Sequence, residues 1–315
     1  MFKIGVSTHV RTLEPADLGA LLIALYAEHL ADVVTNSYAL QFSAVPAAVI
    51  SAAHQAFAQA AAEGIGFFYG SGDLGDYSPL LGTPQTIWPA SDSLVTAVGG
   101  TSLFIGAHNN REGELGWGLT LDPVVTSGGG ASYALPVPGQ YFAGSGGGPA
   151  QGYAEPAYQR GVVPPSLAGP GNPRRVVPDV ADADLATPVL VGIAINGTYT
   201  EAGGGGTSIA SPLFAGLEAL ADQAADGPHG FVNPLLYLLH GTGIFHDITR
   251  RPAPVALALS ISGTTYLDTL QGDTSLMAGP GYDDQTGLGS PDGAAYVGAL
   301  SFSPGWPAGG VRSKA

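Results

Sequence analysis

The chain has 315 residues, 45% of them hydrophobic, so it is long enough to form one large α/β domain or two small ones around a sizeable core. Its 10 Lys and Arg against 25 Asp and Glu give a formal net charge of −15, which argues against nucleic acid as a partner because phosphate binding requires basic patches. It contains no cysteine, which excludes disulfides and thiol chemistry, and no apolar stretch of the roughly 18 residues that a membrane-spanning helix needs.

Residues 2–100 alternate between strand-like and helix-like patterns. Strands joined by helical crossovers predict a parallel sheet covered on both faces, and ligands of such sheets bind beyond the carboxyl ends of the strands. Asp73 lies at such an end, and Gly64 is typical of a residue that closes a helix. The strands are expected at Ile4–Val6, Val33–Ser37, Ile65–Tyr69 and Leu94–Val98, and the helices at Leu18–Leu30 and Val45–Glu63.

Residues 101–173 are rich in Gly, Pro and Tyr and show little periodicity. Two glycine runs, Gly128–Gly130 and Gly144–Gly148, are typical of flexible surface loops, or of extended edges that pair with a bound peptide. Strand character returns over residues 174–195, and residues 231–298 form a mixed C-terminal part. Without an internal repeat or a dividing linker, residues 1–300 are expected to form one domain, followed by a disordered tail at 301–315.

The stretch from Gly203 to Pro212 places Thr207 and Ser208 between four glycines and an apolar segment that is predicted to be a helix. Leu213, Leu217 and Leu220 recur at helical spacing, and Pro212 is expected in the first turn, where a missing N–H is tolerated. A serine at a helix N-terminus lies where free amides and the helix dipole favour a developing anion. For a lone Gly-Thr-Ser, an ordinary N-cap serine after a flexible loop is the alternative.

Several short stretches between residues 31 and 294 form an ordered set. They are Ala31–Tyr38, Ser71–Gly75, Trp88–Ser91, Val98–Thr101, Gly144–Gly148, Pro156–Gln159, Val177–Ala181, Gly206–Ser208, Phe231–Tyr237, His246–Thr249 and Ala278–Asp283. One such motif is a weak signal, but the set in this order resembles the sedolisins, serine-carboxyl peptidases with a subtilisin-like fold. The resemblance implies an α/β fold class: a three-layer domain with a mostly parallel central sheet flanked by helices, here lacking its first elements.

By this resemblance the chain is a serine-type endopeptidase whose nucleophile is Ser208 and whose oxyanion-hole residue is Asp73. The chemistry is consistent with both roles. At acidic pH histidine is protonated and cannot act as a general base, whereas a carboxylate can accept a proton. A second carboxyl group that stays protonated can donate a hydrogen bond to the tetrahedral oxyanion. In isolation, Asp73 is equally well explained as a turn residue between glycines.

The chain departs from the family pattern at the general base. In the family a helix carries Glu and Asp four residues apart, upstream of the segment that corresponds to Val33–Tyr38. Glu14 and Asp17 are three residues apart and fall at the start of the next predicted helix, so no catalytic role is assigned to them. The sequence therefore predicts an N-terminally incomplete peptidase domain that is inactive as it stands.

Two functions remain open at this stage. One is an acid endopeptidase that cleaves peptide or protein substrates; the other is a non-catalytic, calcium-stabilised peptide-binding domain of the same fold. The family resemblance also implies a secreted monomer with no nucleic-acid or membrane partner, although the first residues lack a signal-peptide pattern.

The resemblance further implies one calcium ion in the C-terminal part. Its ligands would be the carboxylates of Asp247 and Asp283 and the carbonyl oxygens of Ile248, Gly279 and Gly281, all hard oxygens of the kind calcium prefers. The alternative is a tight Gly-Pro-Gly turn that Asp283 caps.

Overall fold

The computed structural model describes residues 30–183, 189–195 and 197–301. The predicted strand Ile4–Val6, nearly all of the predicted helix Leu18–Leu30, and residues 302–315 of the predicted tail lie outside these ranges, as do Glu14 and Asp17. Within these ranges, no helix combines the length and apolarity needed to cross a membrane.

The central sheet confirms the predicted parallel arrangement. Its strand order is β1 (Val33–Asn36), β3 (Gly66–Gly70), β5 (Thr96–Ile105) and β12 (Val180–Ala183), all parallel, with β6 (Arg111–Gly116) antiparallel to β5. The carboxyl ends of β3 and β5 therefore lie at the same edge, and the segment that carries Asp73 follows β3 directly.

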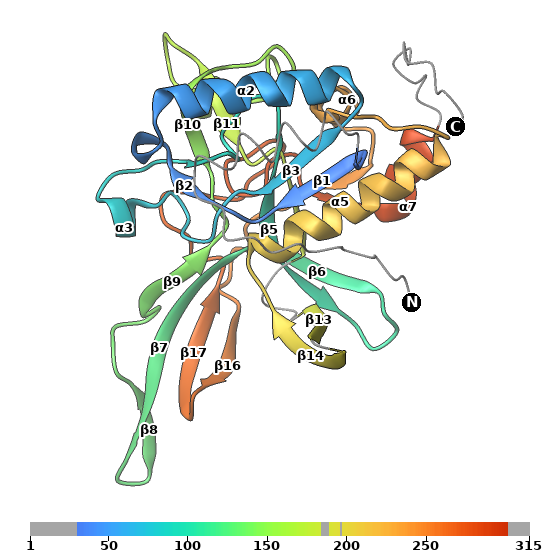
Figure 1. Cartoon of the computed structure of the whole chain (residues 1–315). Coiled ribbons are helices and arrows are strands. Elements are labelled where there is room, and N and C mark those ends of the chain that lie inside the picture. Colours follow the sequence, from blue (N-terminus) through green and yellow to red (C-terminus); the bar gives the residue numbers. More distant parts are fainter. Residues whose placement is uncertain (1–29, 184–188, 196, 302–315) are drawn as a thin grey trace.

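Helices cover the two faces of this sheet (Figure 1). The helix α2 (Ala47–Ala62) lies on one face, and α5 (Thr207–Ala224) and α7 (Gly293–Leu300) lie on the other. The alternation of side chains along β3 explains the two cores, because Phe67 and Tyr69 pack edge-on against Phe57 of α2, whereas Phe68 faces Phe214 of α5. Each face of the sheet thus has its own hydrophobic core.

Residues 101–173, whose sequence shows little periodicity, are largely made of β-strands. β5 extends to Ile105, and β7 (Gly118–Ser127) pairs with β8 (Gly130–Tyr133), β9 (Gln140–Gly144) and β17 (Thr264–Leu270), which in turn pairs with β16 (Ala256–Ile261). These strands extend away from the central sheet in Figure 1. Gly128 and Gly129 have φ of 59° and 85°, so this glycine run forms a hairpin turn, whereas Gly144–Gly148 is buried.

Short elements complete the described chain. They are β2 (Leu40–Gln41), a 3-10 helix (Phe42–Ala44), α3 (Ser78–Leu81), β4 (Ile87–Trp88), β10 (Gly148–Ala154), α4 (Pro165–Ala168), β11 (Arg174–Val177), β13 (Val189–Ile195), β14 (Thr198–Gly204), α6 (Asn233–Leu238), β15 (Phe245–His246) and β18 (Ser290–Pro291).

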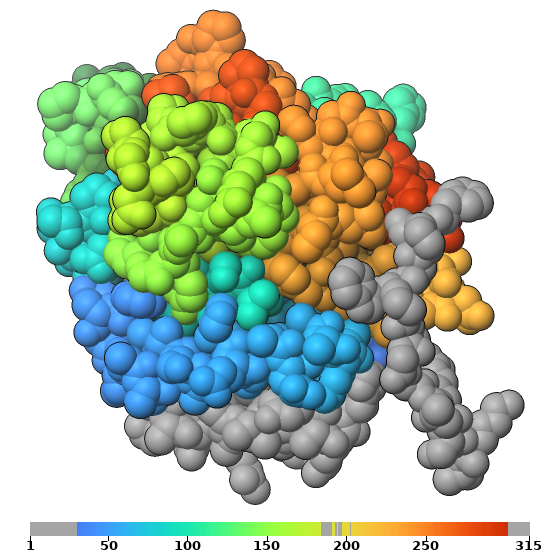
Figure 2. Space-filling view, turned by 90° about the horizontal axis from the view of Figure 1, so that it is seen from above, coloured from blue at the N-terminus to red at the C-terminus, as the bar shows by residue number. Residues whose placement is uncertain are grey.

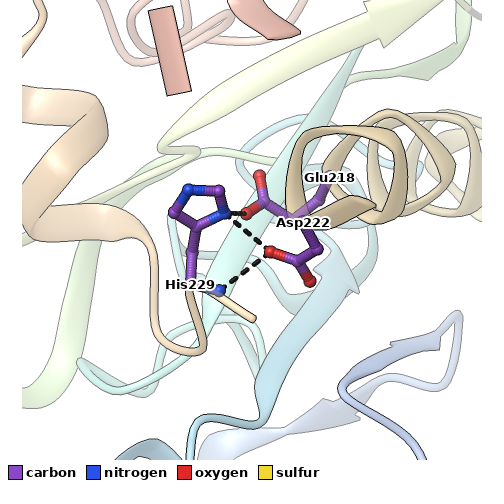
Figure 3. Close-up of side chains that lie close together, drawn as sticks. All are labelled: Glu218, Asp222 and His229. Atoms are coloured by element: carbon purple, nitrogen blue, oxygen red, sulfur yellow. Dashed lines mark hydrogen bonds and ion pairs between the residues drawn. The ribbon is translucent and has the colours of Figure 1, made fainter. Parts of the chain in front are cut away.

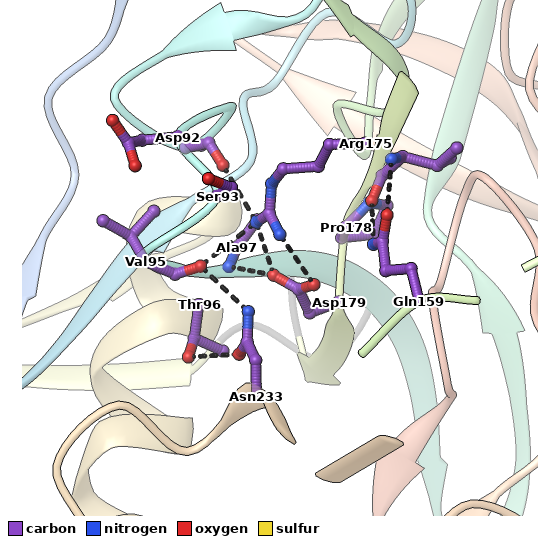
Figure 4. A network of polar contacts seen from close by, with 12 residues as sticks. Asp92, Ser93, Val95, Thr96, Ala97, Gln159, Arg175, Pro178, Asp179 and Asn233 are labelled. Carbon is purple, nitrogen blue, oxygen red and sulfur yellow. Dashed lines mark hydrogen bonds and ion pairs between the residues drawn. The ribbon is translucent and has the colours of Figure 1, made fainter. Parts of the chain in front are cut away.

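A fully buried ion pair joins β11 to the residue before β12, next to the start of β5 (Figure 4). Arg175 Nη2 lies 2.7 Å from Asp179 Oδ2, and neither side chain is exposed to solvent. The guanidinium also donates to the carbonyl oxygens of Ala90 and Val95 at 3.3 and 3.1 Å, while the carboxylate accepts the amide of Ala97 at 2.8 Å. One ion pair therefore fixes the loop before β5, the start of β5 and the β11–β12 connection.

Asn233 and Gln159 extend this network to α6 and to the segment before α4. Asn233 Nδ2 donates to the carbonyl of Val95 at 3.0 Å, and Gln159 exchanges two hydrogen bonds with the backbone of Val176, at 2.7 and 2.9 Å. Buried side-chain amides that are fully hydrogen-bonded specify one arrangement of the segments they join.

We predict that Arg175→Met lowers the free energy of unfolding by about 3–5 kcal/mol, because it leaves the buried Asp179 carboxylate without its cation. Urea unfolding monitored by tryptophan fluorescence measures the change. Arg160→Met is the control, because Arg160 is exposed, and it should alter the free energy by about 0.5 kcal/mol or less. A loss no larger in Arg175→Met than in the control would contradict the structural role of the pair.

Candidate active site

Ser208 is the second residue of α5, as the sequence predicts for a serine at a helix N-terminus. The helix begins at Thr207, so Pro212 lies inside it and not in its first turn, which corrects the sequence-based expectation. A proline at this position has no N–H to donate to the carbonyl oxygen of Ser208 four residues earlier. That carbonyl accepts a hydrogen bond from Ser37 Oγ at 3.1 Å instead, so the residue after β1 holds the backbone of Ser208.

The apolar stripe of α5 also differs from the predicted one. Leu213 and Leu220 are 36% and 38% exposed, and Phe214 and Ala221 are among the residues that face the core. A further contact to the sheet is polar, because Thr35 of β1 and Ser211 of α5 share a hydrogen bond of 2.9 Å between their hydroxyls.

Asp73 lies directly beside the first turn of α5, which carries Ser208. Its Oδ1 accepts the backbone N–H of Thr207 at 2.8 Å and the hydroxyl of Thr207 at 2.9 Å, although the two residues are 134 positions apart in sequence. The same hydroxyl accepts the N–H of Gly72 at 3.1 Å. The carboxylate therefore caps the first free amide of α5, and the cap comes from the loop after β3.

Two glycines permit this close approach. Gly206 has φ of 96°, and a Cβ there would lie 2.8 Å from Asp73 Oδ2. A Cβ on Gly70 would lie 2.9 Å from the carbonyl oxygen of Thr207. Any side chain at either position would separate the loop after β3 from the N-terminus of α5.

Further carboxyl groups lie beneath the loop that carries Asp73. Asp273 Oδ1 lies against Gly75, and burial raises the pKa of Asp273 to about 7. Asp76 behaves in the opposite way: burial alone would raise its pKa, but hydrogen bonds from Ser275 and Ser78 lower it. The pKa values of the two carboxyl groups beneath this loop are therefore shifted in opposite directions.

The residues predicted to bind calcium also come together. Asp247 lies 3.1 and 3.2 Å from the N–H of Gly281 through its two oxygens, and Asp283 Oδ2 lies 3.1 Å from the N–H of Gly279. Both carboxylates thus contact one three-residue turn, in which Gly281 has φ of 76°. Asp283 also accepts the N–H groups of Gln285 and Thr286, so it caps the turn as the alternative reading expects.

A cavity of about 450 Å³ lies away from these residues. Phe42, Val45, Ile50, His54 and Tyr153 are among its lining residues, on the α2 side of the central sheet. In Figure 2 the blue residues of α2 adjoin the green residues that include β10. None of the predicted site residues lines this cavity, so it is no part of the candidate active site.

The sequence analysis did not identify one cluster of potential metal ligands. Glu218 and Asp222 of α5 lie beside His229 in the turn before α6. The signal was available, because two acidic residues four apart share a helix face. Glu218 lies almost three turns beyond Ser208, about 15 Å along the axis, so this Glu–Asp pair cannot act as a base for Ser208.

No family model matches the chain. Among curated proteins, it is 36% identical over 255 residues to kumamolisin of Bacillus sp. (strain MN-32), covering 80% of this chain and 39% of that protein. It is 31% identical over 265 residues to sedolisin of Pseudomonas sp. (strain 101), covering 80% and 38%, and 29% identical over 291 residues to tripeptidyl-peptidase 1 of Mus musculus, covering 89% and 45%. The chain thus spans less than half the length of these relatives.

Among solved structures, Pseudomonas sedolisin, a serine-carboxyl proteinase complexed with two molecules of pseudo-iodotyrostatin, matches with a TM-score of 0.70 at 25% identity. The match covers 93% of this chain and 71% of that one, so the likeness extends over nearly the whole α/β architecture described above. Sequence and fold agree, and the chain belongs to the sedolisin family.

Proposed function

We propose that the chain carries the nucleophile and the oxyanion-hole residue of an acid endopeptidase of the sedolisin class. The observation that carries the proposal is the pair of hydrogen bonds from Thr207 to Asp73, which brings a carboxyl group next to Ser208 at a helix N-terminus. The names of the relatives support a peptidase, and a peptide or protein is the substrate that this chemistry requires.

In the proposed reaction Ser208 Oγ forms a bond to the carbonyl carbon of the substrate while its proton passes to a carboxylate base. Asp73, in its neutral acid form, donates a hydrogen bond to the oxyanion, and the N-terminus of α5 adds its positive dipole end. The amine then leaves with a proton, and water hydrolyses the resulting ester on Ser208. Among the described residues no carboxylate contacts Ser208 Oγ, so none of them is assigned as the base. The nucleophile is therefore tested in a protein extended by the upstream reading frame.

We also propose that a calcium ion binds between Asp247 and the turn at Gly279–Asp283. The donors present fit calcium, because all are oxygens and two are carboxylates. Among the described residues, no hydrogen-bond donor contacts the carbonyl oxygens of Ile248, Gly279 or Gly281. Burial raises the pKa of Asp283 to about 7, and a nearby cation would stabilise its charged form. The ion would supply positive charge that joins two segments far apart in sequence.

A secreted, monomeric protein with a single domain over residues 1–300 is the context proposed for this activity. It is consistent with the acidic composition, which keeps the charge modest at the acidic pH where the carboxyl chemistry operates.

The first prediction tests the nucleophile. The protein translated from the upstream reading frame should cleave a denatured protein substrate at acidic pH, and Ser208→Ala should reduce the rate to that of the uncatalysed reaction or close to it. Ser51→Ala, at an exposed serine of α2, is the matched control and should retain full activity. This chain alone should be inactive.

Cleavage that persists in Ser208→Ala would reject the proposal. Binding of peptides without cleavage by the extended protein would favour the non-catalytic domain instead.

The second prediction concerns Asp73 in the extended protein. Asp73→Asn can keep its oxygen on Thr207 and turn its amide towards the substrate, so it should retain part of the activity. Asp73→Ala should lower kcat by roughly a hundredfold or more, because the oxyanion loses a donor. Thermal melts of both variants separate this effect from loss of the α5 cap. Normal turnover by a folded Asp73→Ala variant would leave Asp73 with the capping role only.

The third prediction concerns calcium. The melting temperature should rise with free calcium, since binding at about 100 times Kd adds about 2.7 kcal/mol to the free energy of unfolding. Asp247→Ala should lose this rise but melt like the wild type in chelator, because Asp247 is exposed. Asp283→Ala should melt lower in both conditions, because the turn also loses its cap. Equal melting temperatures with calcium and with chelator in the wild type would exclude the ion.

A further inference from the structure

Glu218, Asp222 and His229 form a compact cluster on the side of α5 that faces α7 (Figure 3). Their potential ligand atoms all lie within 4.8 Å of one another. His229 Nδ1 lies 2.6 Å from Asp222 Oδ1 and 3.1 Å from Glu218 Oε1, so one ring nitrogen faces two carboxylates. The side chains of Glu218 and His229 are only 1% and 6% exposed.

The other nitrogen of the imidazole defines its orientation. His229 Nε2 lies 3.2 Å from the carbonyl oxygen of Leu300, at the end of α7. Because a carbonyl only accepts hydrogen bonds, Nε2 carries a hydrogen. In the neutral ring the lone pair is then on Nδ1, directed at the space between the carboxylates. A backbone carbonyl in this role is typical of histidines that bind metals.

Two buried oxygens in the cluster are poorly satisfied. Among the described residues no hydrogen bond reaches Asp222 Oδ2, and Glu218 Oε1 has only the 3.1 Å contact with His229 Nδ1, although both atoms are shielded from solvent. Buried carboxylate oxygens without a donor are costly, so each such atom needs a partner. The second oxygen of Glu218 is held by the hydroxyl of Tyr296 from α7, which leaves Oε1 directed at the imidazole.

We propose that Glu218, Asp222 and His229 bind a divalent cation, with zinc as the best fit. Zinc binds through imidazole nitrogen and carboxylate oxygen, and three protein ligands with a water complete its tetrahedron. Zinc–ligand bonds of about 2.0–2.2 Å require the ligand atoms to separate slightly more than Nδ1 and Oδ1 do here. Asp222 can provide this by turning Oδ2 towards the ion while Oδ1 keeps the N–H of His229, which it accepts at 2.8 Å.

The competing occupant is a proton. Hydrogen bonds that the imidazole donates to the carboxylates of Asp222 and Glu218 raise the pKa of His229 to about 10, so without a cation the ring holds a hydrogen on Nδ1 as well. One hydrogen is shared between the two carboxylates, whereas a cation binds both. A metal ion has to displace this hydrogen, so the measurements are made at several alkaline pH values.

The bound ion would join α5, the turn before α6 and, through Tyr296 and Leu300, α7. It lies about 15 Å or more along α5 from Ser208 and shares no residue with the proposed calcium site. The site is therefore a structural clamp, and its test does not depend on peptidase activity.

The test is a zinc titration of the chelator-treated chain by calorimetry, with cobalt absorption as a spectroscopic readout of ligand geometry. We expect one zinc per chain, a visible cobalt spectrum typical of a tetrahedral site, and a melting temperature that rises with zinc. An excess of calcium should not displace the zinc. No zinc binding by the wild type, or zinc that calcium displaces, would overturn the proposal.

Variants locate the ion. His229→Gln and Glu218→Gln should each weaken zinc binding by at least about a hundredfold, and Tyr296→Phe by about tenfold, because it releases Glu218 without removing a ligand. His54→Gln is the matched control, since His54 Nδ1 also lies 2.9 Å from a buried carboxylate, that of Asp92. Unchanged binding in a folded His229→Gln or Glu218→Gln variant would assign the zinc to another site.

Discussion

The Arg175–Asp179 ion pair is the interaction on which the arrangement of this fold depends. A guanidinium and a carboxylate without solvent contact depend on partners that the protein supplies, and most of the polar atoms of this pair have one, although Arg175 Nε has none among the described residues. Ala90, Val95 and Ala97 supply backbone groups, and Tyr237 of α6 adds its hydroxyl to Asp179 at 3.0 Å. The pair thus links segments from four parts of the chain. Its contacts lie at the starts of β5 and β12, and Val98 of β5 pairs with Gly70, the last residue of β3.

Asp73 serves both the fold and the proposed chemistry. Its Oδ1 holds the amide and hydroxyl of Thr207, which positions the first turn of α5 against the loop after β3. Its Oδ2 lies against Gly206. The glycines that precede Thr207 allow this contact. A structural role and the proposed catalytic role of Asp73 are therefore compatible, because Oδ1 holds Thr207 and Oδ2 takes no part in that contact.

The central sheet and its helices were predictable, because each strand and helix near residues 33–98 has a clear periodic pattern. The β7–β9 and β16–β17 strands were not, because their pairing depends on partners up to about 150 residues apart in sequence. The exposure of Leu213 and Leu220 was missed because helical spacing shows which residues share a face but not which face is buried. The Ser208–Asp73 neighbourhood followed from family motifs. His229 did not, because its partners on α5 are brought near only by the fold.

Pro212 has a consequence for the attachment of Ser208 to the rest of α5. By removing one rung of the hydrogen-bond ladder of α5, it separates the first turn of the helix, with Ser208, from the rigid remainder. The carbonyl of Ser208 is instead attached to Ser37, on the segment that leaves β1. The position of Ser208 is therefore coupled to the segment after β1 through this hydrogen bond, as well as to its own helix.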